Sequence, residues 1–481
     1  MLSAETLGLD PMPRGAIPFR VGQPINWAFA LRDPRSGLVV AVGSWWAVGS
    51  WLVLGLLFGL AMGPYQALSG LGFRIQAALW LSAEPQSLLG CLLVFGATSL
   101  LVLLAWGPLA GGRGGGTASL LALDRASQSE GNAVALLWLQ QLNLATQLRR
   151  LPLMLLTHLG GLAVGVESPS VALGASLLLA IRRRWPQLQP LVSLSPQLLA
   201  VIGGAAGLGA AFRSPLLAVA YGLEELGQRS GLPLVVPALL LAGSGTLVAT
   251  TMGQPARLPG LALGSLATGV WGWAVLLTLV GAAAGALFMR LLLPAAAVVK
   301  QLLGQRRLLG ALILAGSLSL LALVSGGLSL NDGSLSLAAA LSGETVGSPA
   351  IWLWRLLSSV LSLALGAPGG LMHSSMTLGA LLISPLQELP ELSSSDLAQL
   401  AAVGATALFA AAHGAPLFCA AFVFTLQGDP ALLPLLLLVA AVAATLGERW
   451  RGEGWNEHQV RMLLEQQPSS PQNPSATPSS R

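Results

Sequence analysis

Six long apolar stretches constrain what this chain can fold into. They cover residues 38–62, 88–110, 232–252, 268–298, 308–329 and 430–446. Most of them reach the roughly 20 residues that a helix needs to span the hydrocarbon core of a bilayer. Charged residues make up only 9% of the sequence, whereas a soluble globular domain carries about 25%. The sequence therefore predicts an all-α integral membrane protein.

Basic residues lie at the ends of the apolar stretches rather than in a stripe that would bind nucleic acid. The chain carries 24 Lys and Arg against 19 Asp and Glu. Arginines at 182–184 and 306–307 mark the cytoplasmic side, where they contact lipid headgroups. Because arginines also flank the first and last apolar stretches, we expect both termini in the cytoplasm. The first 37 residues do not resemble a cleaved signal peptide, which is compatible with a bacterial inner membrane.

A weak internal repeat of about 200 residues divides the chain into two parts. VALGASL at 171–177 matches MTLGALL at 376–382. GAAGLGAAFRSPL at 204–216 matches GATALFAAAHGAPL at 404–417, with one residue inserted in the second copy. Chance similarity of Ala/Gly/Leu-rich sequence is the alternative. Halves that each cross an odd number of times would lie in opposite orientations, as in many transporters.

The predicted organisation follows from this repeat. We place a cytoplasmic segment at 1–37, the two inverted halves at 38–250 and 260–448, a cytoplasmic helix at 449–465 and a disordered tail at 466–481. The segments 171–181 and 376–384 are too short to span and follow turns that contain Gly and Pro. We expect both to be half-helices whose amino ends meet near the midplane of the membrane.

Helix amino ends that meet inside a membrane favour anions. They expose unpaired N–H groups and about half a positive charge, so no fixed lysine is needed. Broken helices also bind cations through their carbonyl ends, which leaves that alternative open at this point. Glu167 lies in such a turn, just ahead of Pro169 and between two apolar runs. An ionisable residue there is a functional candidate, although a helix-capping glutamate is the plain alternative.

Several motifs, in order, resemble the CLC family of chloride channels and proton-coupled chloride transporters. GVESPSVALGA at 165–175 resembles the family motif GREGP, and AAGLGAAFRSPLLAVAYGLEEL at 205–226 resembles its AAGLAAAF segment ending in EE. GAPGGLMHSSMTLGALL at 366–382 resembles GxPGGxFxPxLxLGAxxG, and GDPALLPLLLLVAAVAATLGE at 428–448 resembles the family's late GD-x-x-x-x-LPL stretch. The resemblance covers most of residues 100–460. It implies a CLC-like inverted-topology repeat with broken and half-spanning helices, in a homodimer with one pore per subunit.

The resemblance also implies roles for single residues. Glu167 matches the gating glutamate, which occupies an anion site until protonation releases it. Glu225 matches the internal glutamate that transfers protons, which favours a proton-coupled antiporter over a passive channel, although acids at a cytoplasmic helix end are the alternative. The residues that match the anion-binding motifs are Gly112, Arg113, Gly114, Gly165, Gly370, Leu371, Met372 and Asn456.

Three of these positions depart from the family pattern. Arg113 replaces a pore serine, and its guanidinium could hold an anion, pair with Glu167 or swing to the cytoplasmic interface. Met372 and Ser374 replace an aromatic residue and a proline, with His373 between them. Asn456 stands where a tyrosine donates its hydroxyl to the anion, and its amide is still a donor. The preferred anion, whether chloride, nitrate or fluoride, stays open.

We expect transport of an anion, chloride above others, in exchange for protons. A passive channel of the same fold, a member with altered selectivity and a member that has lost transport are the alternatives. A membrane-embedded enzyme would need paired catalytic groups, and none stands out. We predict no cofactor and no metal site, because Cys91 and Cys419 lie in apolar stretches and the histidines lack ligand spacing. Of the histidines, His373 alone is placed to titrate near the pathway, whereas His158, His413 and His458 receive no role.

Overall fold

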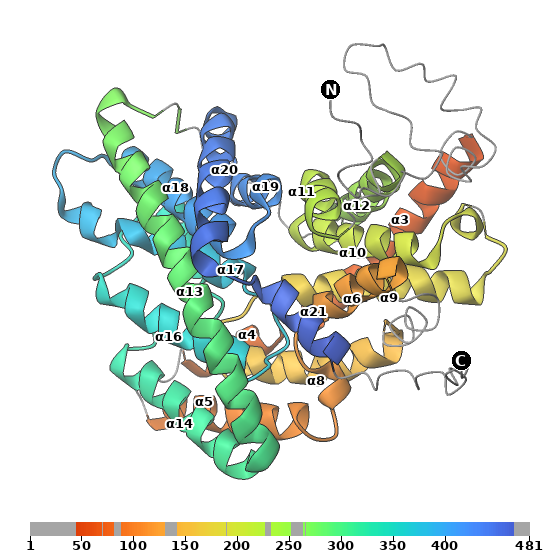
Figure 1. Cartoon of the computed structure of the whole chain (residues 1–481), viewed down its shortest axis with the longest axis horizontal. Helices are drawn as coiled ribbons and strands as arrows, with labels where there is room; N and C mark the ends of the chain where they lie inside the picture. The colour runs from red at the N-terminus through yellow and green to blue at the C-terminus, as the bar shows by residue number, and fades with distance from the viewer. Residues whose placement is uncertain are drawn as a thin grey trace, which may run out of the picture.

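The computed structural model describes residues 45–69, 71–80, 88–129, 142–188, 190–226, 232–251, 263–264 and 266–465. Within these ranges the chain folds into helices, and the only β-type pairing is an isolated bridge between Gly165 and Gly370 (Figure 1). The predicted all-α architecture is confirmed. The segment 1–37 and the tail 466–481 lie outside the described residues, so their predicted states stay predictions.

The first group of helices runs from α3 to α12. It comprises α3 (Trp45–Ser69), α4 (Leu71–Trp80), α5 (Leu88–Ala105), the 3-10 turn η2 (Ala110–Gly112), α6 (Thr117–Ser129), α8 (Leu144–Leu159), α9 (Glu167–Arg184), the 3-10 turn η3 (Leu191–Ser193), α10 (Pro196–Phe212), α11 (Pro215–Tyr221), the π-helical turn η4 (Gly222–Leu226) and α12 (Leu232–Thr251).

The second group runs from η5 to α20, and α21 follows it. It comprises η5 (Thr268–Val270), α13 (Trp271–Gln305), α14 (Arg307–Val324), α15 (Ser334–Leu341), α16 (Ala350–Ala364), α17 (Met372–Ala380), η6 (Leu381–Glu388), α18 (Ser394–His413), α19 (Pro416–Gln427), η7 (Pro430–Leu432), α20 (Leu433–Arg451) and α21 (Trp455–Glu465). In Figure 1 the two groups lie mostly on opposite sides of the molecule, and α21 runs across the centre in contact with α6 and α13.

Six helical stretches in the described ranges are long and apolar enough to cross a membrane. They are Val48–Tyr65, Leu88–Ala105, Thr268–Gln305, Arg307–Val324, Ser394–His413 and Pro430–Arg451. Five of them correspond to predicted apolar stretches. The stretch Ser394–His413 was missed because its serines, Asp396 and many alanines lower its hydrophobicity, and 89% of its apolar window is buried inside the protein. The predicted stretch 232–252 forms α12.

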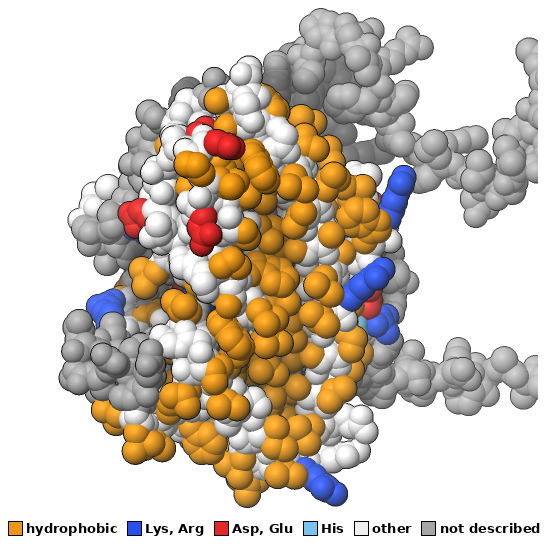
Figure 2. Space-filling model, turned by 90° about the vertical axis from the view of Figure 1, so that its left-hand side faces the viewer, with side chains coloured by type: hydrophobic (Ala, Val, Ile, Leu, Met, Phe, Trp, Pro, Cys, Tyr) orange, Lys and Arg blue, Asp and Glu red, His pale blue; other side chains and the backbone are white. Residues whose placement is uncertain are grey.

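A continuous apolar surface is exposed on one side of the molecule. Figure 2 shows a broad band of hydrophobic side chains, with Lys and Arg mostly along one edge and Asp and Glu mostly along the other. Large side chains such as Val275, Leu287 and Leu320 are exposed on α13 and α14. Such a band suits the hydrocarbon core of a bilayer. The chain is therefore a multi-pass integral membrane protein.

The two copies of the sequence repeat make the same helix crossing. A Cβ atom on Gly174 of α9 would lie 2.2 Å from the carbonyl oxygen of Gly203 in α10. In the second copy, a Cβ atom on Gly379 of α17 would lie 2.2 Å from the carbonyl oxygen of Gly404 in α18. Glycine at these positions lets two backbones touch. Gly203 in the first copy of the repeat is therefore structurally equivalent to Gly404 in the second copy.

Aligning the two copies on these equivalent glycines removes the one-residue insertion that the sequence match contained. Helix α10 is followed by Arg213, whose backbone is in the left-handed conformation (φ 54°). Helix α18 is followed by Gly414, which adopts the same conformation (φ 87°). The next helices then begin at Pro215 and Pro416. Counted from the crossing glycines, the two segments align without a gap. The predicted insertion was wrong because the sequence match began one residue late in the first copy.

The two helices predicted as half-helices both begin earlier than the sequence pattern indicated, and α9, with 18 residues, is longer than a half-helix. Helix α9 starts at Glu167 and has 18 residues, whereas the prediction began at 171. Helix α17 starts at Met372 and has 9 residues, whereas the prediction began at 376. Hydrophobicity misses these first turns because they hold polar residues, which suit the amino end of a helix.

Candidate functional site

The amino ends of α9 and α17 meet at a pair of glycines. The amide nitrogen of Gly165 lies 3.2 Å from the carbonyl oxygen of Gly370, and the reciprocal distance is 2.9 Å. A Cβ atom on Gly165 would approach a carboxylate oxygen of Glu167 to 2.2 Å, and one on Gly370 would lie 2.9 Å from the hydroxyl oxygen of Ser168. Because Gly165 and Gly370 carry no side chains, the amino ends of α9 and α17 can approach each other closely.

Glu167 is the first residue of α9, and its side chain is fully buried. Its Oε1 accepts a hydrogen bond from the backbone nitrogen of His373, at 3.1 Å, and contacts the Nδ1 atom of the same residue. Within the described chain, Oε2 has no hydrogen-bond partner. His373 is the second residue of α17, so its N–H is one of the donors that a helix leaves unpaired. The carboxylate thus occupies the anion-binding end of the opposing helix.

Leu371 and Met372 directly precede His373 at the amino end of α17. Both are buried, as a site inside the protein requires. They were predicted to donate their amides to the central anion. Their position agrees with that role, and the role itself stays a prediction.

The other predicted amide donors are engaged with carbonyl groups. Gly112 donates to Leu109 (2.8 Å), Arg113 to Ala110 (3.2 Å) and Gly114 to Gly366 (3.1 Å). Gly165 and Gly370 donate to each other, as described above. The amides of Gly112 and Arg113 thus close a local turn, whereas those of Gly114, Gly165 and Gly370 join segments far apart in the sequence. The sequence carries no signal for the long-range bonds, and the anion-binding role of these five residues stays a prediction.

Arg113 does not reach Glu167. Its guanidinium carbon lies 4.0 Å from the centre of the Trp106 ring, and the Trp106 indole donates to the carbonyl oxygen of Leu365 at 2.8 Å. Among the ion pairs of the described residues, Glu167 pairs only with His373. Of the alternatives for Arg113, the structure therefore excludes pairing with Glu167 in this conformation.

His373 received only a passing role in the sequence analysis, and the structure places it against the gating candidate. Its ring stacks on Phe212, with centroids 5.5 Å apart, and meets Phe422 edge-on at 5.8 Å. The next residue, Ser374, fixes the turn by donating its hydroxyl to the carbonyl oxygen of Ala163 at 2.7 Å. The available signal was a histidine inside the motif that begins a half-helix.

Glu225 belongs to a second polar cluster, which is separate from the contact between Glu167 and His373. It lies in the π-helical turn η4, and such turns are frequent at functional sites. Its Oε1 accepts a hydrogen bond from the Asn456 amide at 2.6 Å, and its Oε2 lies 3.5 Å from Nε2 of His413. Neighbouring Glu224 instead caps α19, accepting from the backbone of Leu417 and Phe418. Asn456 is thus bonded to Glu225, and its predicted role as an anion donor stays a prediction.

Four buried phenylalanines connect the surroundings of the two glutamates. They are Phe212, Phe409, Phe418 and Phe422. The centroids of Phe212 and Phe422 are 4.6 Å apart, and those of Phe409 and Phe422 are 6.0 Å apart. His373 packs on this cluster beside Glu167, and His413 packs on it beside Glu225, 5.4 Å from Phe409. Each glutamate therefore has its own histidine, with an apolar cluster between them.

Sequence reasoning gave His413 no role. The signal that could have found it is the repeat, because His413 and Phe212 end the equivalent helices α18 and α10. Just ahead of α21, Glu453 accepts hydrogen bonds from Arg461 at 2.9 and 2.7 Å. These hydrogen bonds lower the pKa of Glu453 to about 2, so the pair keeps its charges near neutral pH.

A buried carboxylate at a helix amino end, inside a membrane-spanning bundle of two similar helix groups, is the arrangement of a protein that passes anions. Residues 95–448 match the family model for voltage gated chloride channels, and the chain belongs to this family. The proposed resemblance to CLC proteins is thereby confirmed. The family consists of channels and transporters rather than enzymes. No curated protein matches the chain.

Solved structures share the fold. A slow cyanobacterial Cl⁻/H⁺ antiporter matches with a TM-score of 0.68 and 20% identity, over 87% of this chain and 98% of its own. A CLC-type fluoride/proton antiporter matches with a TM-score of 0.65 and 20% identity, over 85% and 97%. A eukaryotic CLC transporter matches with a TM-score of 0.64 and 20% identity, over 86% and 74%.

The position of the Glu167 carboxylate can be tested with Gly165→Ala. The new Cβ would lie 2.2 to 2.3 Å from both carboxylate oxygens, and the backbone there is held by Gly370. We expect the carboxylate to be displaced and chloride efflux from proteoliposomes to lose its pH dependence. Gly111→Ala is the control, since its nearest neighbour is Arg149 Nη1 at 3.5 Å. Unaltered pH dependence in Gly165→Ala would show that the carboxylate lies elsewhere.

Proposed function

We propose that this protein exchanges anions, chloride above others, for protons across a membrane, with Glu167 as the gate. The observation that carries the proposal is the hydrogen bond from the His373 amide, at the amino end of α17, to the buried Glu167 carboxylate. An anion that uses the same N–H donors must displace this carboxylate. Protonation weakens the hold of the helix end on Glu167, so a proton and an anion compete for one place.

The approximate free energies that act on the Glu167 carboxylate support a gate that an anion can displace. A helix amino end favours a nearby negative charge by about 0.3 to 2 kcal/mol. Burial opposes the same charge by several kcal/mol, and Oε2 of Glu167 has no hydrogen bond within the described chain to offset this cost. A second anion 4 Å away adds about 4 kcal/mol of repulsion at an effective dielectric constant near 20. The ionised carboxylate and the anion therefore exclude each other, whereas the protonated acid and the anion do not.

The second glutamate supplies the proton route in this proposal. Glu225 is largely buried yet partly accessible, with 14% of its side chain exposed, and it contacts His413. A proton would enter at Glu225 and leave at Glu167, beside His373. The four phenylalanines between these pairs offer no donors to an anion, so they keep anions out of this route. Proton and anion paths would then meet only at Glu167.

A passive channel of the same fold is the second candidate function. It would need a gate but no proton-transfer residue on the far side of the phenylalanine cluster. The contacts of Glu225 with Asn456 and His413 favour the antiporter. The anion itself is proposed as chloride, and fluoride is the alternative that one similar structure suggests by its description.

We also propose a homodimer in a bacterial inner membrane, with both termini in the cytoplasm. The separation of Lys and Arg from Asp and Glu across the apolar band supports a defined orientation (Figure 2). The meeting of the α9 and α17 amino ends supports two inverted halves at 38–250 and 260–448. Membrane lipid is the expected neighbour of the exposed apolar helices.

Glu167→Gln tests the gate. Glutamine mimics the protonated acid but carries no proton, so proton transport should vanish while anions still pass. Where ionised Glu167 keeps most of the parent protein closed, the variant should exceed the parent flux about tenfold. Chloride and proton fluxes in proteoliposomes provide the measurement, with exposed Glu391→Gln as the control. Proton-driven chloride uptake by Glu167→Gln would refute the proposal.

Glu225→Gln tests the proton route separately. We expect chloride flux to continue and proton flux to fall to background, because the amide cannot relay a proton to His413. The neighbouring glutamate gives a matched control: Glu224→Gln changes the cap of α19 and should retain coupling. Equal coupling in Glu225→Gln and the parent would favour a passive role for Glu225.

A further inference from the structure

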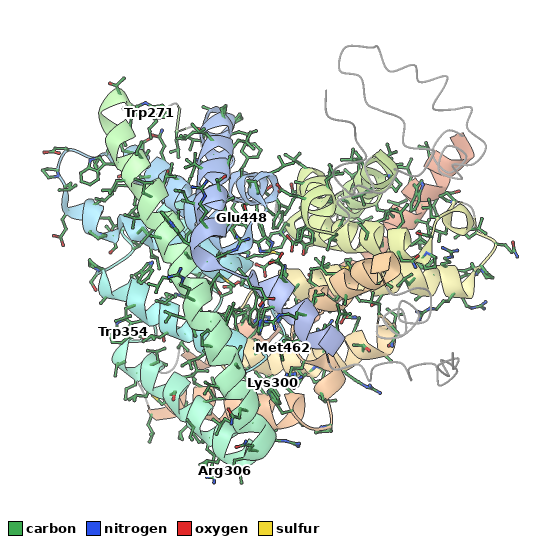
Figure 3. The ribbon with its side chains drawn as sticks, in the orientation of Figure 1. Trp271, Lys300, Arg306, Trp354, Glu448 and Met462 are labelled. Atoms are coloured by element: carbon green, nitrogen blue, oxygen red, sulfur yellow. The ribbon has the colours of Figure 1, made fainter. Side chains whose placement is uncertain are left out.

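A large cavity lies between the glycine-rich loop and α21. Its volume is about 920 Å³, and helices α8, α13 and α21 complete its walls. Figure 3 shows Lys300 on α13 and Met462 on α21 close together in the centre of the molecule, and both line this cavity. The cavity reaches Gly115, which packs against Ser168 beside the gate.

The cavity is strongly basic. Arg113, Arg149, Arg150 and Lys300 line it, and its described lining contains no Asp or Glu. None of these four side chains forms an ion pair with a carboxylate of the described residues. Four like charges around one space repel each other, and this repulsion is relieved when a negative ligand enters.

Of the four basic residues, Arg150 gives the strongest evidence for an anion site, because its guanidinium is buried. Its Nε donates to the carbonyl oxygen of Gly112 at 3.3 Å, and its Nη1 contacts Oε1 of Gln147. Both partners are neutral. A Cβ atom on Gly116 would lie 2.6 Å from Nη2, so the loop glycine makes room for the guanidinium at the cavity wall. A buried charge without an opposite charge is destabilising, and a bound anion would compensate it.

The chemistry of the lining selects the class of anion. Arginine presents a planar fork of N–H donors that fits the oxygens of phosphate or carboxylate, whereas a halide offers only a point charge. Three arginines and one lysine exceed what a single monovalent ion can neutralise. The volume also lies within the roughly 300 to 1,000 Å³ that is usual for sites of small organic ligands.

We propose that this cavity binds a phosphate group, carried either by a free phosphate compound or by the headgroup of an anionic lipid. Arg149 and Lys300 would hold the outer oxygens, and Arg113 and Arg150 the inner ones. An occupant would narrow the space that leads to Gly115 and so reduce transport. Binding itself is independent of the proposed function, and only the effect on flux rests on it.

Binding is tested by calorimetry on the purified full-length chain in detergent, with inorganic phosphate and AMP as ligands and chloride at matched ionic strength as reference. We expect saturable binding of both phosphate compounds, and we expect it to persist when the chloride site at Glu167 is already filled. The double variant Arg149→Gln/Lys300→Gln should lower the affinity about tenfold, since charge-assisted hydrogen bonds are lost. Arg290→Gln, an exposed position on α13 outside the cavity, is the matched control.

The source of the phosphate is distinguished in nanodiscs. If free compounds are the occupants, AMP binds equally in phosphatidylcholine and in phosphatidylglycerol discs. If a lipid headgroup is the occupant, phosphatidylglycerol abolishes AMP binding, and the double variant no longer shows this difference. Absence of saturable phosphate binding in detergent, or equal affinity in the double variant and the parent, would overturn the site. Phosphate binding without any chloride flux would instead count against the proposed function alone.

Discussion

The backbone pairing of Gly165 with Gly370 is the interaction on which the rest of the site depends. These bonds join turns from two copies of a repeat, and they bring the amino ends of α9 and α17 to one point. Behind them, each short helix is held by a glycine crossing, Gly174 on Gly203 and Gly379 on Gly404. Backbones in direct contact leave little freedom to adjust, so the positions of the two helix ends are fixed.

Two fixed helix ends in a low-dielectric interior form a place for negative charge, and in this structure Glu167 supplies that charge itself. The chain places a histidine against this carboxylate and another against Glu225, with phenylalanines between. Proton transfer and anion passage can then be separated in space while sharing one residue. The basic cavity beside the glycine-rich loop adds a place where a larger anion could act on the same path.

Local patterns in the sequence predicted the membrane class and the helix starts near Glu167 and Met372, because hydrophobicity, turns and motif order are short-range signals. The contact between Glu167 and His373 joins residues 206 positions apart, and no short-range pattern encodes it. Asn456 meets Glu225 across 231 positions for the same reason. Helix α18 escaped the hydrophobicity pattern because it is covered by protein rather than lipid and tolerates small polar residues. The insertion in the repeat could be corrected only once the glycine crossings gave a structural register.

The central claim is that an anion and the ionised Glu167 carboxylate exclude each other. Chloride binding should then drive proton uptake, since only the protonated form of Glu167 coexists with the bound anion. Isothermal titration calorimetry of chloride binding, repeated in two buffers with different ionisation enthalpies, counts these protons. The account predicts net uptake of protons, at most one per bound chloride. Chloride binding with no proton uptake at any pH would contradict it.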